Sequence, residues 1–204
     1  MSKPRQETKG KRKADVSEAS RTRHRQSGNP GGSESDSDLS KIFNDPIHGT
    51  IRVSGLCLKI IDTPQFQRLR YLTQLGGVYF VFPGATHNRF EHSIGTYYLA
   101  SKFARILRQK HPEQFEEDDI KCIEIAGLCH DLGHGPFSHV FDKMFIPRIK
   151  PDSHWKHEDA SVKMLEHLLE ENKGVKKAFD EFDKDGSRLE LIQDIILGGK
   201  PTVK

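Results

Sequence analysis

The residue types with the clearest chemical potential are histidine and aspartate, and they concentrate in one part of the chain. Ten of the eleven histidines lie after residue 40, and His130-Asp131 ends a strongly apolar stretch over residues 120–129. Histidine nitrogen and carboxylate oxygen bind divalent metals, and phosphate chemistry at a metal needs nearby acids or bases and open coordination positions. Adjacent helical side chains point about 100° apart, so this pair can flank one ion at a helix end.

Further candidate groups lie on both sides of this pair. His92 precedes it in the segment Arg89-Phe90-Glu91-His92, where Arg89 and His92 would share one helical face. After the pair come His134, His139, Asp142 and His157. A single histidine is usually hydrogen-bonded or exposed without a special role, and this interpretation is kept for His87, His111, His154 and His167. The composite set predicts metal-dependent phosphate chemistry.

Helices must position most of these side chains, because apolar residues recur at helical spacing around them. The predicted helices cover residues 88–110, 118–131, 136–144, 157–171 and 188–197. Asp62-Thr63-Pro64 predicts a further helix start, with Gly76-Gly77 as its end. Residues 50–53 and 78–82 are interpreted as short strands that pair with each other. The predicted fold class is therefore mainly α with a small early β-hairpin.

Charge and hydropathy divide the chain near residue 40. The first forty residues hold nine Lys or Arg, six Asp or Glu and only five hydrophobic residues, which cannot offset the entropy of ordering them. We expect residues 1–40 to be a disordered tail, basic and then acidic, and residues 41–204 to form one domain. No apolar run reaches the roughly 20 residues that span a bilayer, which predicts a soluble intracellular protein. Three cysteines without CxxC spacing predict buried, reduced thiols.

At these motifs the chain resembles the HD superfamily of metal-dependent phosphohydrolases, whose pattern is H…HD…D. The resemblance extends to the SAM-and-HD-domain deoxynucleoside triphosphate triphosphohydrolases and covers about residues 41–198. It is carried by residues 41–49, 61–70, 81–85, 87–92 and 127–139. It implies the HD helical fold and the hydrolysis of a dNTP to a deoxynucleoside and inorganic triphosphate.

The resemblance also implies a role for each matching position. The implied metal ligands are His92, His130 and Asp131, with zinc, magnesium, manganese or iron as the divalent ion. The implied catalytic residues are His157, which protonates the leaving group, its supporting carboxylate Asp142, and His134 beside the phosphates. The implied substrate contacts are Gln74, Leu75, Arg89, His134 and His139.

Activation by GTP or dGTP, bound between the subunits of a homotetramer, is a further implication of the resemblance. The matching positions are Lys41, Ile42, Asn44, Asp62, Gln67, Arg70, Val81 and Phe82. Read without the resemblance, Asp62 is only a helix start, and Gln67 and Arg70 form an exposed polar face. The resemblance also implies control of dNTP pools, antiviral restriction and a location in the nucleus, with the cytoplasm as a second compartment and no membrane partner.

Two departures from the family pattern limit what is expected of this chain. A charged tail stands where the family carries a SAM interaction domain, and the family's last metal-binding aspartate would lie beyond Lys204. Asp194 has the spacing of a fourth ligand in some smaller HD enzymes but falls on a different helix. Residues 41–204 are therefore expected to be the N-terminal portion of the HD domain, C-terminally incomplete and catalytically weak or inactive.

Two alternative functions remain open on the sequence. One is a non-catalytic regulator that binds guanine nucleotides and, through the basic clusters at residues 9–13 and 21–25, single-stranded nucleic acid. The same clusters could instead serve nuclear import. The other alternative is a smaller HD phosphohydrolase that acts on other nucleotides.

Overall fold

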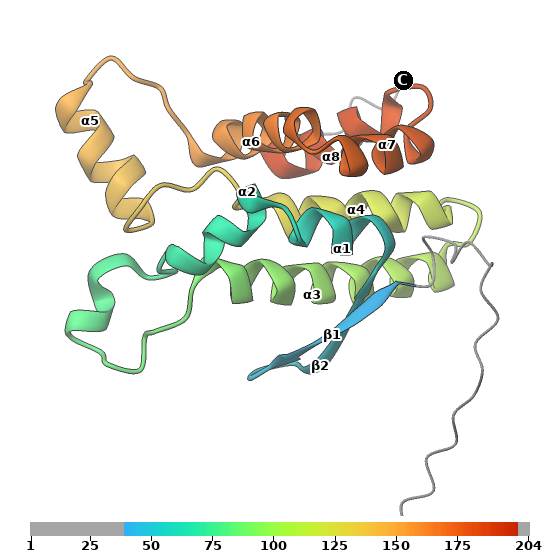
Figure 1. Ribbon diagram of the computed structural model, residues 1–204, viewed down its shortest axis with the longest axis horizontal. Coiled ribbons are helices and arrows are strands. Elements are labelled where there is room, and N and C mark those ends of the chain that lie inside the picture. Colours follow the sequence, from blue (N-terminus) through green and yellow to red (C-terminus); the bar gives the residue numbers. More distant parts are fainter. Residues whose placement is uncertain (1–38, 200–204) are drawn as a thin grey trace, which may run out of the picture. The chain divides into compact units, whose positions relative to one another are not determined.

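The computed structural model describes residues 39–199. The tail predicted over residues 1–40 lies outside the described residues except for Leu39 and Ser40, and so do both basic clusters. None of the helices within the described range combines the length and the apolar character that crossing a bilayer requires. Figure 1 shows a helical body with one two-stranded sheet, which confirms the mainly α fold class and the small early hairpin.

The hairpin consists of β1 (Ser40–Asp45) and β2 (Gly49–Ser54), which pair antiparallel from Ser40 opposite Ser54 to Asp45 opposite Gly49. The Asp45 carboxylate closes the turn, because its Oδ1 accepts the backbone N–H groups of Ile47 and His48 at 2.8 and 2.7 Å. Gly49 continues the turn at a φ of 73°, a region that glycine enters without steric cost. Alternate residues of β2 face the core.

The predicted partner of β2 was wrong. Residues 78–82 do not form a strand; instead η2 (Gly76–Phe80) is a short 3-10 helix, and residues 40–45 take the place beside β2. The backbone of this segment is satisfied locally, since Val78 N–H donates to the carbonyl of Leu75 at 3.2 Å. Its aromatic side chains are exposed, with Phe80 at 82% and Phe82 at 64%. The apolar and aromatic composition of residues 78–82 therefore does not reflect a strand.

The helix predicted from Pro64 is also shorter than expected. The chain forms α1 (Gly55–Ile61), then α2 (Pro64–Gln67) and the 3-10 helix η1 (Arg68–Tyr71). The helix start was located correctly, because the Thr63 hydroxyl caps α2 by accepting Phe66 N–H at 3.3 Å. Gly76 begins η2 at a φ of 58° rather than ending a long helix.

The remaining helices are α3 (Arg89–Lys110), α4 (Glu117–Cys129), α5 (Ile146–Ile149), α6 (His157–Glu171), α7 (Lys173–Phe182) and α8 (Ser187–Leu197). Of these, α3, α4, α6 and α8 follow the predictions. The helix predicted over residues 136–144 is displaced: residues 136–138 turn tightly, and helical backbone begins at His139 and continues through one wide π-helical turn, η3 (Phe141–Phe145), into α5. The sequence did not predict α1 or α7.

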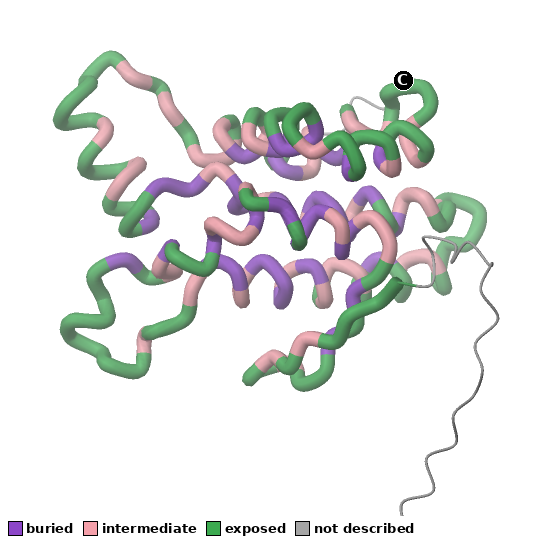
Figure 2. The backbone as a smooth tube through the Cα atoms, in the orientation of Figure 1, coloured by how far each residue is buried: buried purple, intermediate pink, exposed green. Residues whose placement is uncertain are grey.

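The core lies where the long helices meet. Helix α3 packs on α4, α4 packs on α8, and α6 packs on both α7 and α8 (Figure 1). Figure 2 shows purple, buried stretches on α3, α4 and the helices beside them, alternating with pink and green. Fully buried leucine and isoleucine side chains, each stabilising by about 1.5–3 kcal/mol, come from early, middle and late parts of the chain: Ile60, Leu69, Ile125, Leu128, Leu165 and Ile192.

The three cysteines are free and buried, as predicted. Burial raises the pKa of Cys122 and of Cys129 to about 12, and it raises the pKa of Cys57 well above the usual range. All three are therefore protonated near neutral pH. Neither group of metal-type donor atoms found within residues 39–199 contains a cysteine, so histidine and carboxylate groups are the candidates for that role.

Candidate metal and phosphate site

Two helices bring the first group of side chains together. Helix α3 begins where the Glu91 side chain accepts the N–H of Asn88 at 3.1 Å, and its first turn carries Arg89 and His92. Helix α4 ends at Cys129, so that His130 and Asp131 follow directly from its last turn. The two helices approach closely, because a Cβ atom at Gly127 would lie 3.0 Å from the Cβ of Ala100.

The first group consists of His92, His130 and Asp131. The Nε2 atoms of the two histidines lie 3.2 Å apart, and each lies 3.2 Å from Oδ2 of Asp131. The Nδ1 of His130 is 2.8 Å from the carbonyl oxygen of Gly127. Since a carbonyl can only accept, Nδ1 carries a proton, and Nε2 faces the group: it offers a lone pair when the ring is neutral and donates to Asp131 when the ring is charged.

The electrostatics of this group suit a divalent cation. Two neutral imidazole nitrogens 3.2 Å apart repel through their lone pairs unless a proton or a cation lies between them. A point roughly 2.0–2.2 Å from all three donor atoms exists beside their triangle, which is the bond length of zinc to nitrogen and oxygen ligands. Burial alone would raise the pKa of Asp131, but hydrogen bonds from His130 and His92 hold it far below its usual range. The residues therefore fit a metal ion.

Arg89 places a buried positive charge next to this group. Its side chain is only 2% exposed; Nη1 donates to Asp131, Nη2 donates to the hydroxyl of Ser138, and Nε is buried without a partner. Burial lowers the pKa of Arg89, and the negative charge of Asp131 opposes that shift. A guanidinium stays protonated at physiological pH, so the spare Nε–H is available to an anion.

The second group consists of His134, His139 and His157, with Asp142 behind two of them. Oδ2 of Asp142 lies 3.2 Å from Nδ1 of His139 and 3.1 Å from Nδ1 of His157. Burial raises the pKa of Asp142, but the hydrogen bonds and charges of these two histidines outweigh burial and lower it. The carboxylate therefore stays ionised and accepts the Nδ1 proton of each ring. Both Nε2 atoms are left for other partners.

His134 is the most buried member of the second group, at 1% exposure. Its ring stacks on that of His157 with centroids 4.0 Å apart. Neither ring nitrogen has a hydrogen-bond partner, because the approach of Nε2 to Asp131 Oδ1 at 3.5 Å lacks hydrogen-bond geometry. Burial, reinforced by the charge of Arg89, lowers the pKa of His134 to about 3. The ring is neutral near pH 7.

Three residues that sequence reasoning missed hold the segment after α4 in place. Arg68 donates from Nη1 to the carbonyl of Leu132 at 3.3 Å and from Nη2 to the carbonyl of His134 at 2.7 Å. The Ser161 hydroxyl accepts Gly133 N–H at 2.9 Å. Ser138, the third, accepts from Arg89. The sequence signal for this tight packing was the pair of glycines at 133 and 135. The structure shows why a glycine is needed: a Cβ at 133 would lie 2.2 Å from the backbone of Ala160.

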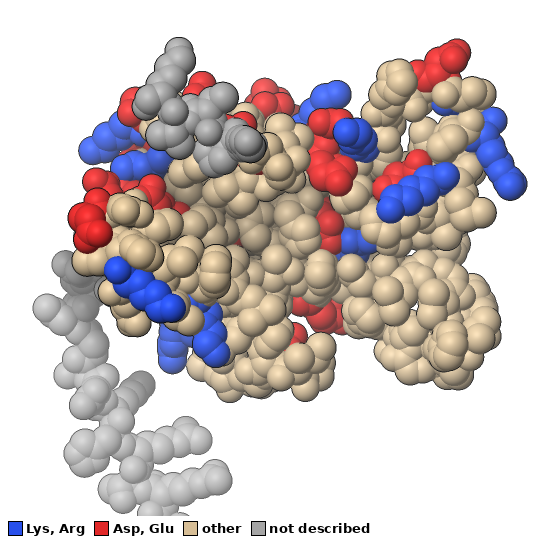
Figure 3. Space-filling model, turned by 180° about the vertical axis from the view of Figure 1, so that it is seen from behind, with Lys and Arg blue, Asp and Glu red and all other residues tan. Residues whose placement is uncertain are grey.

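The predicted substrate contacts Gln74 and Leu75 come from the segment before η2. This segment is tied to the start of α3, since Gln74 N–H donates to the carbonyl of His87 at 3.1 Å and Arg89 N–H donates to that of Leu72 at 2.8 Å. Oε1 of Gln74 is buried without a partner, and Leu75 is exposed. Residues 72–88 contain no charged side chain and form the tan lobe in Figure 3.

The positions matched to a guanine nucleotide fall into three places. Lys41 Nζ lies 2.6 Å from Asp62 Oδ2, and Arg70 Nε donates to Gln67 Oε1 at 2.7 Å while its guanidinium lies over the ring of Phe90. Ile42 and Asn44 share β1 with Lys41. Val81 and Phe82 are exposed after η2. Asp194 lies in α8 and belongs to neither donor group found within residues 39–199.

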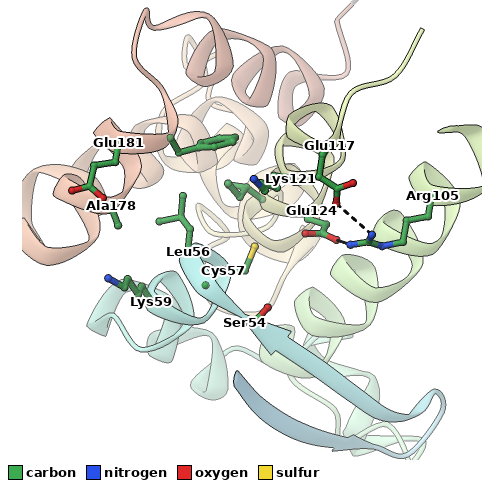
Figure 4. Close-up of a pocket in the computed structure, with 13 residues that line it drawn as sticks. Ser54, Leu56, Cys57, Lys59, Arg105, Glu117, Lys121, Glu124, Ala178 and Glu181 are labelled. Carbon is green, nitrogen blue, oxygen red and sulfur yellow. Dashed lines mark hydrogen bonds and ion pairs between the residues drawn. The ribbon is translucent and has the colours of Figure 1, made fainter. Parts of the chain in front are cut away.

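Two cavities help to locate the site. One of about 520 Å³ reaches His92 and is also lined by His48, His87 and Glu91. Another of about 420 Å³ lies between α1, α3, α4 and α7 (Figure 4), and none of its lining residues belongs to the histidine groups. Its charged wall is already paired, as Arg105 contacts Glu124 at 3.1 Å and Glu117 at 3.5 Å. The chemistry of the fold is therefore centred on the histidine groups.

Comparison with known proteins matches residues 89–197 to the HD domain family. The chain is 63% identical over 141 residues to the deoxynucleoside triphosphate triphosphohydrolase SAMHD1 of Mus musculus, covering 69% of this chain and 21% of that protein. The Homo sapiens protein of the same name is 58% identical over 146 residues, with coverages of 71% and 23%. A Dictyostelium discoideum homolog is 44% identical over 160 residues, with 78% and 30%. The chain thus spans about a fifth to a third of the length of these relatives.

Proposed function

The chain belongs to the HD domain family, and on that premise we propose that it carries the reaction site of a divalent-metal-dependent deoxynucleoside triphosphate triphosphohydrolase. The reaction would convert a dNTP to a deoxynucleoside and inorganic triphosphate. The names of the vertebrate relatives support this substrate class. The observation that carries the proposal is the meeting of three metal-type donor atoms with a buried arginine and a histidine–carboxylate pair.

His92, His130 and Asp131 would hold the metal ion, which could be zinc, magnesium, manganese or iron. When bound, a divalent ion supplies Lewis-acid stabilisation of the negative charge that develops at the phosphorus centre. The hydrogen bond from His130 to the Gly127 carbonyl fixes the ring orientation that this role requires.

Arg89 would bind the phosphate chain through its spare donors. A guanidinium offers a planar, permanent charge that matches phosphate oxygens better than an ammonium does. His134 and His139 would add contacts to the same phosphates, the first as a neutral ring because its pKa is lowered to about 3. Gln74 and Leu75 would contact the nucleoside end, where the buried Gln74 Oε1 still lacks a partner.

His157 would complete the reaction by moving a proton. Attack of water on the α-phosphorus forms a new P–O bond, releases a proton from the water to solvent and breaks the bond to the 5′-oxygen. That oxygen leaves as an alkoxide unless it is protonated. Nε2 of His157 would deliver that proton while Nδ1 stays bonded to Asp142 at 3.1 Å. The ionised carboxylate stabilises the positive ring that must form before transfer.

The decisive experiment measures triphosphate release from dGTP in the presence of Mg²⁺ or Mn²⁺. We expect His157→Gln to lower kcat by about 10²- to 10⁴-fold while the metal content of the protein stays unchanged. His111→Gln, which changes an exposed histidine outside both groups, is the matched control. Binding of dGTP without any triphosphate release by the wild-type chain would contradict the proposal and favour the non-catalytic regulator.

Activation by a guanine nucleotide is a second part of the proposal. Two observations favour it: Lys41 of β1 pairs with Asp62, and Arg70, paired with Gln67, lines a cavity together with Asn44 of β1. Asp62 could accept from a guanine edge, and Arg70 could read it. We expect GTP, but not ATP, to increase the sedimentation coefficient toward that of a homotetramer. Arg70→Ala should abolish the GTP effect, and Arg52→Ala should not.

The biological roles and the location are proposals that depend on the same activity. Control of dNTP pools and antiviral restriction would follow from dNTP hydrolysis. A nuclear location and affinity for single-stranded nucleic acid are supported only by the composition of the basic clusters at residues 9–13 and 21–25. Deletion of residues 1–25 should abolish both, measured by microscopy and by the salt dependence of binding.

A further inference from the structure

The turn before His139 holds two residues in an unfavourable backbone conformation. Phe137 has a φ of 59° and Ser138 a φ of 56°, and within residues 39–199 these are the non-glycine residues with positive φ. Cβ makes this left-handed region costly for residues other than glycine, so such residues persist where their surroundings hold them. The contacts that hold this pair therefore matter.

A distant glycine provides one of those contacts. Gly76, at the start of η2, has its own positive φ, and a Cβ atom there would lie 2.6 Å from the carbonyl oxygen of Phe137. The backbones at 76 and 137 are thus packed directly against each other, with no room for a side chain. Gly76 immediately follows Gln74 and Leu75. The segment with the proposed nucleoside contacts, Gln74 and Leu75, is therefore packed against the turn before His139 through the backbones of Gly76 and Phe137.

Ser138 uses this conformation to reach Arg89. The residue is 5% exposed, and its hydroxyl accepts from Nη2 of Arg89 while Asp131 accepts from Nη1. Two acceptors on different segments fix the plane of a guanidinium, whereas one acceptor leaves it free to rotate. The orientation of the unpartnered Nε–H of Arg89 therefore depends on Ser138.

We propose that Ser138 is a positioning residue that orients Arg89 for the triphosphate chain, and that Gly76 holds Ser138 in register with the nucleoside-contact segment. This inference rests on the proposed function, because it assigns Arg89 to phosphate binding. It adds a residue that acts through Arg89 without taking part in the chemistry. It also predicts that a change at Gly76, where an added Cβ would meet the backbone of Phe137, alters phosphate affinity.

The test compares Ser138 variants of the 204-residue chain by calorimetric titration with inorganic triphosphate and by KM and kcat for dGTP. Ser138→Ala should weaken triphosphate binding about tenfold and raise KM with it, leaving kcat within about threefold. Ser138→Gly also removes the hydroxyl but relieves the backbone strain, so it should be more stable than Ser138→Ala and yet bind triphosphate equally weakly. Ser138→Asn keeps an acceptor in a residue that tolerates positive φ and should recover most of the affinity.

Matched controls exist for both arms of the proposal. Ser40→Ala removes a hydroxyl that accepts from an exposed arginine, Arg52, at 2.9 Å, and should change nothing. Gly76→Ala should weaken triphosphate binding as Ser138→Ala does, whereas Gly77→Ala, whose Cβ would meet only the Phe80 ring at 4.0 Å, should not.

Each outcome has a distinct meaning. Wild-type affinity for triphosphate in both Ser138→Ala and Ser138→Gly would overturn the positioning role. Equal effects of Gly76→Ala and Gly77→Ala would overturn the link to the nucleoside segment. A wild-type chain that binds triphosphate but releases none from dGTP contradicts the proposed function while the comparison of affinities still decides the role of Ser138. A wild-type chain that binds no triphosphate overturns both.

Discussion

The two histidine groups lie side by side but are built in opposite ways. His92, His130 and Asp131 stand at the ends of two regular helices, α3 and α4. His134 and His139 stand on an irregular segment with strained residues and a π-helical turn, and His157 begins the next helix. Regular helices fix a separation between donor atoms, whereas an irregular segment can orient each ring separately.

Their carboxylates also play opposite parts. Asp131 points its oxygen at the Nε2 atoms of the first group, so all three donor atoms converge within 3.2 Å of one another. Asp142 instead takes the Nδ1 protons of the second group and leaves the Nε2 atoms for other partners. The first arrangement suits a cation. The second suits a proton or a phosphate oxygen, and the predictions below are designed to separate these two properties.

The largest effect is expected when the first group loses a ligand. His130→Ala should lower the affinity for Zn²⁺ or Mn²⁺ by about 100-fold or more, because even loss of a partner behind a ligand costs 10- to 100-fold. His139→Ala should leave metal affinity unchanged. Metal per chain after dialysis against a chelator series measures both. An equal loss in the two variants would show that the groups do not divide metal binding in this way.

The next effect separates the packing of the irregular segment from that of an ordinary helix. Gly133→Ala would drive a Cβ to within 2.2 Å of the backbone of Ala160 and Ser161, and should lower the free energy of unfolding by about 2–3 kcal/mol. Gly174→Ala, in α7 with nothing within 4 Å of the new Cβ, should raise it by about 0.5 kcal/mol. Urea titration followed by circular dichroism measures both, and matching changes would contradict the assigned packing.

As the pH falls, His134 of the second group should lower the free energy of unfolding before Asp131 and Asp142 become protonated. Burial lowers the pKa of His134 to about 3, so between pH 6 and pH 4.5 the unfolded chain binds a proton at this residue that the folded chain does not. Stability therefore falls with falling pH, by at most about 1.4 kcal/mol per pH unit.

The shifted pKa values of Asp131, Asp142 and His130 affect stability outside that window. The pKa values of Asp131 and Asp142 are lowered, so their contribution is lost only below about pH 4. Burial would lower the pKa of His130, but its hydrogen bond to Asp131 raises it, and its contribution is lost only as pH rises above about 6.5. In metal-free protein, His134→Gln should flatten the slope of unfolding free energy between pH 6 and pH 4.5. An unchanged slope would mean that His134 does not stay neutral.

The smallest effect concerns the arginine that supports the second group. Lysine at position 68 cannot reach the Leu132 and His134 carbonyls together, so Arg68→Lys should cost about 1 kcal/mol of unfolding free energy. Metal affinity should not change. Arg52→Lys, on the exposed face of the hairpin, is the control and should cost less than about 0.5 kcal/mol. A loss of metal affinity in Arg68→Lys would show that the two groups are coupled.

Prediction from sequence succeeded where one physical signal dominated. The helices at residues 88–110 and 157–171 were located closely because a repeated apolar stripe must face the core. The run at 78–82 misled because apolar residues indicate burial only when something covers them, and here they stay exposed. The start of the helix predicted over 136–144 was misplaced because the chain turns at residues 136–138, beside a close approach of Gly135 to the Phe141 ring that no local pattern contains.

The functional side chains of the site were predictable from sequence, but the residues that support them were not. Residue types identified the histidines and aspartates, since few other side chains can bind a metal or move a proton near neutral pH. The residues that hold them were not predictable, because Arg68 acts across more than sixty positions of sequence and Ser138 acts through a backbone conformation. Repeated glycines at 133 and 135 were the signal that pointed to tight packing there.

Gly127 sets the distance between helices α3 and α4. Its missing side chain lets α4 lie against α3 at Ala100 and Thr96, where a Cβ would come within 3.0 and 3.4 Å. Thr96 is one turn after His92, and Gly127 is one turn before His130, so the gap between the helices sets the gap between the two imidazoles. A methyl group at 127 would open that gap by a few tenths of an ångström. The spacing of the two imidazoles that would hold an ion is thus set by a residue outside the donor group.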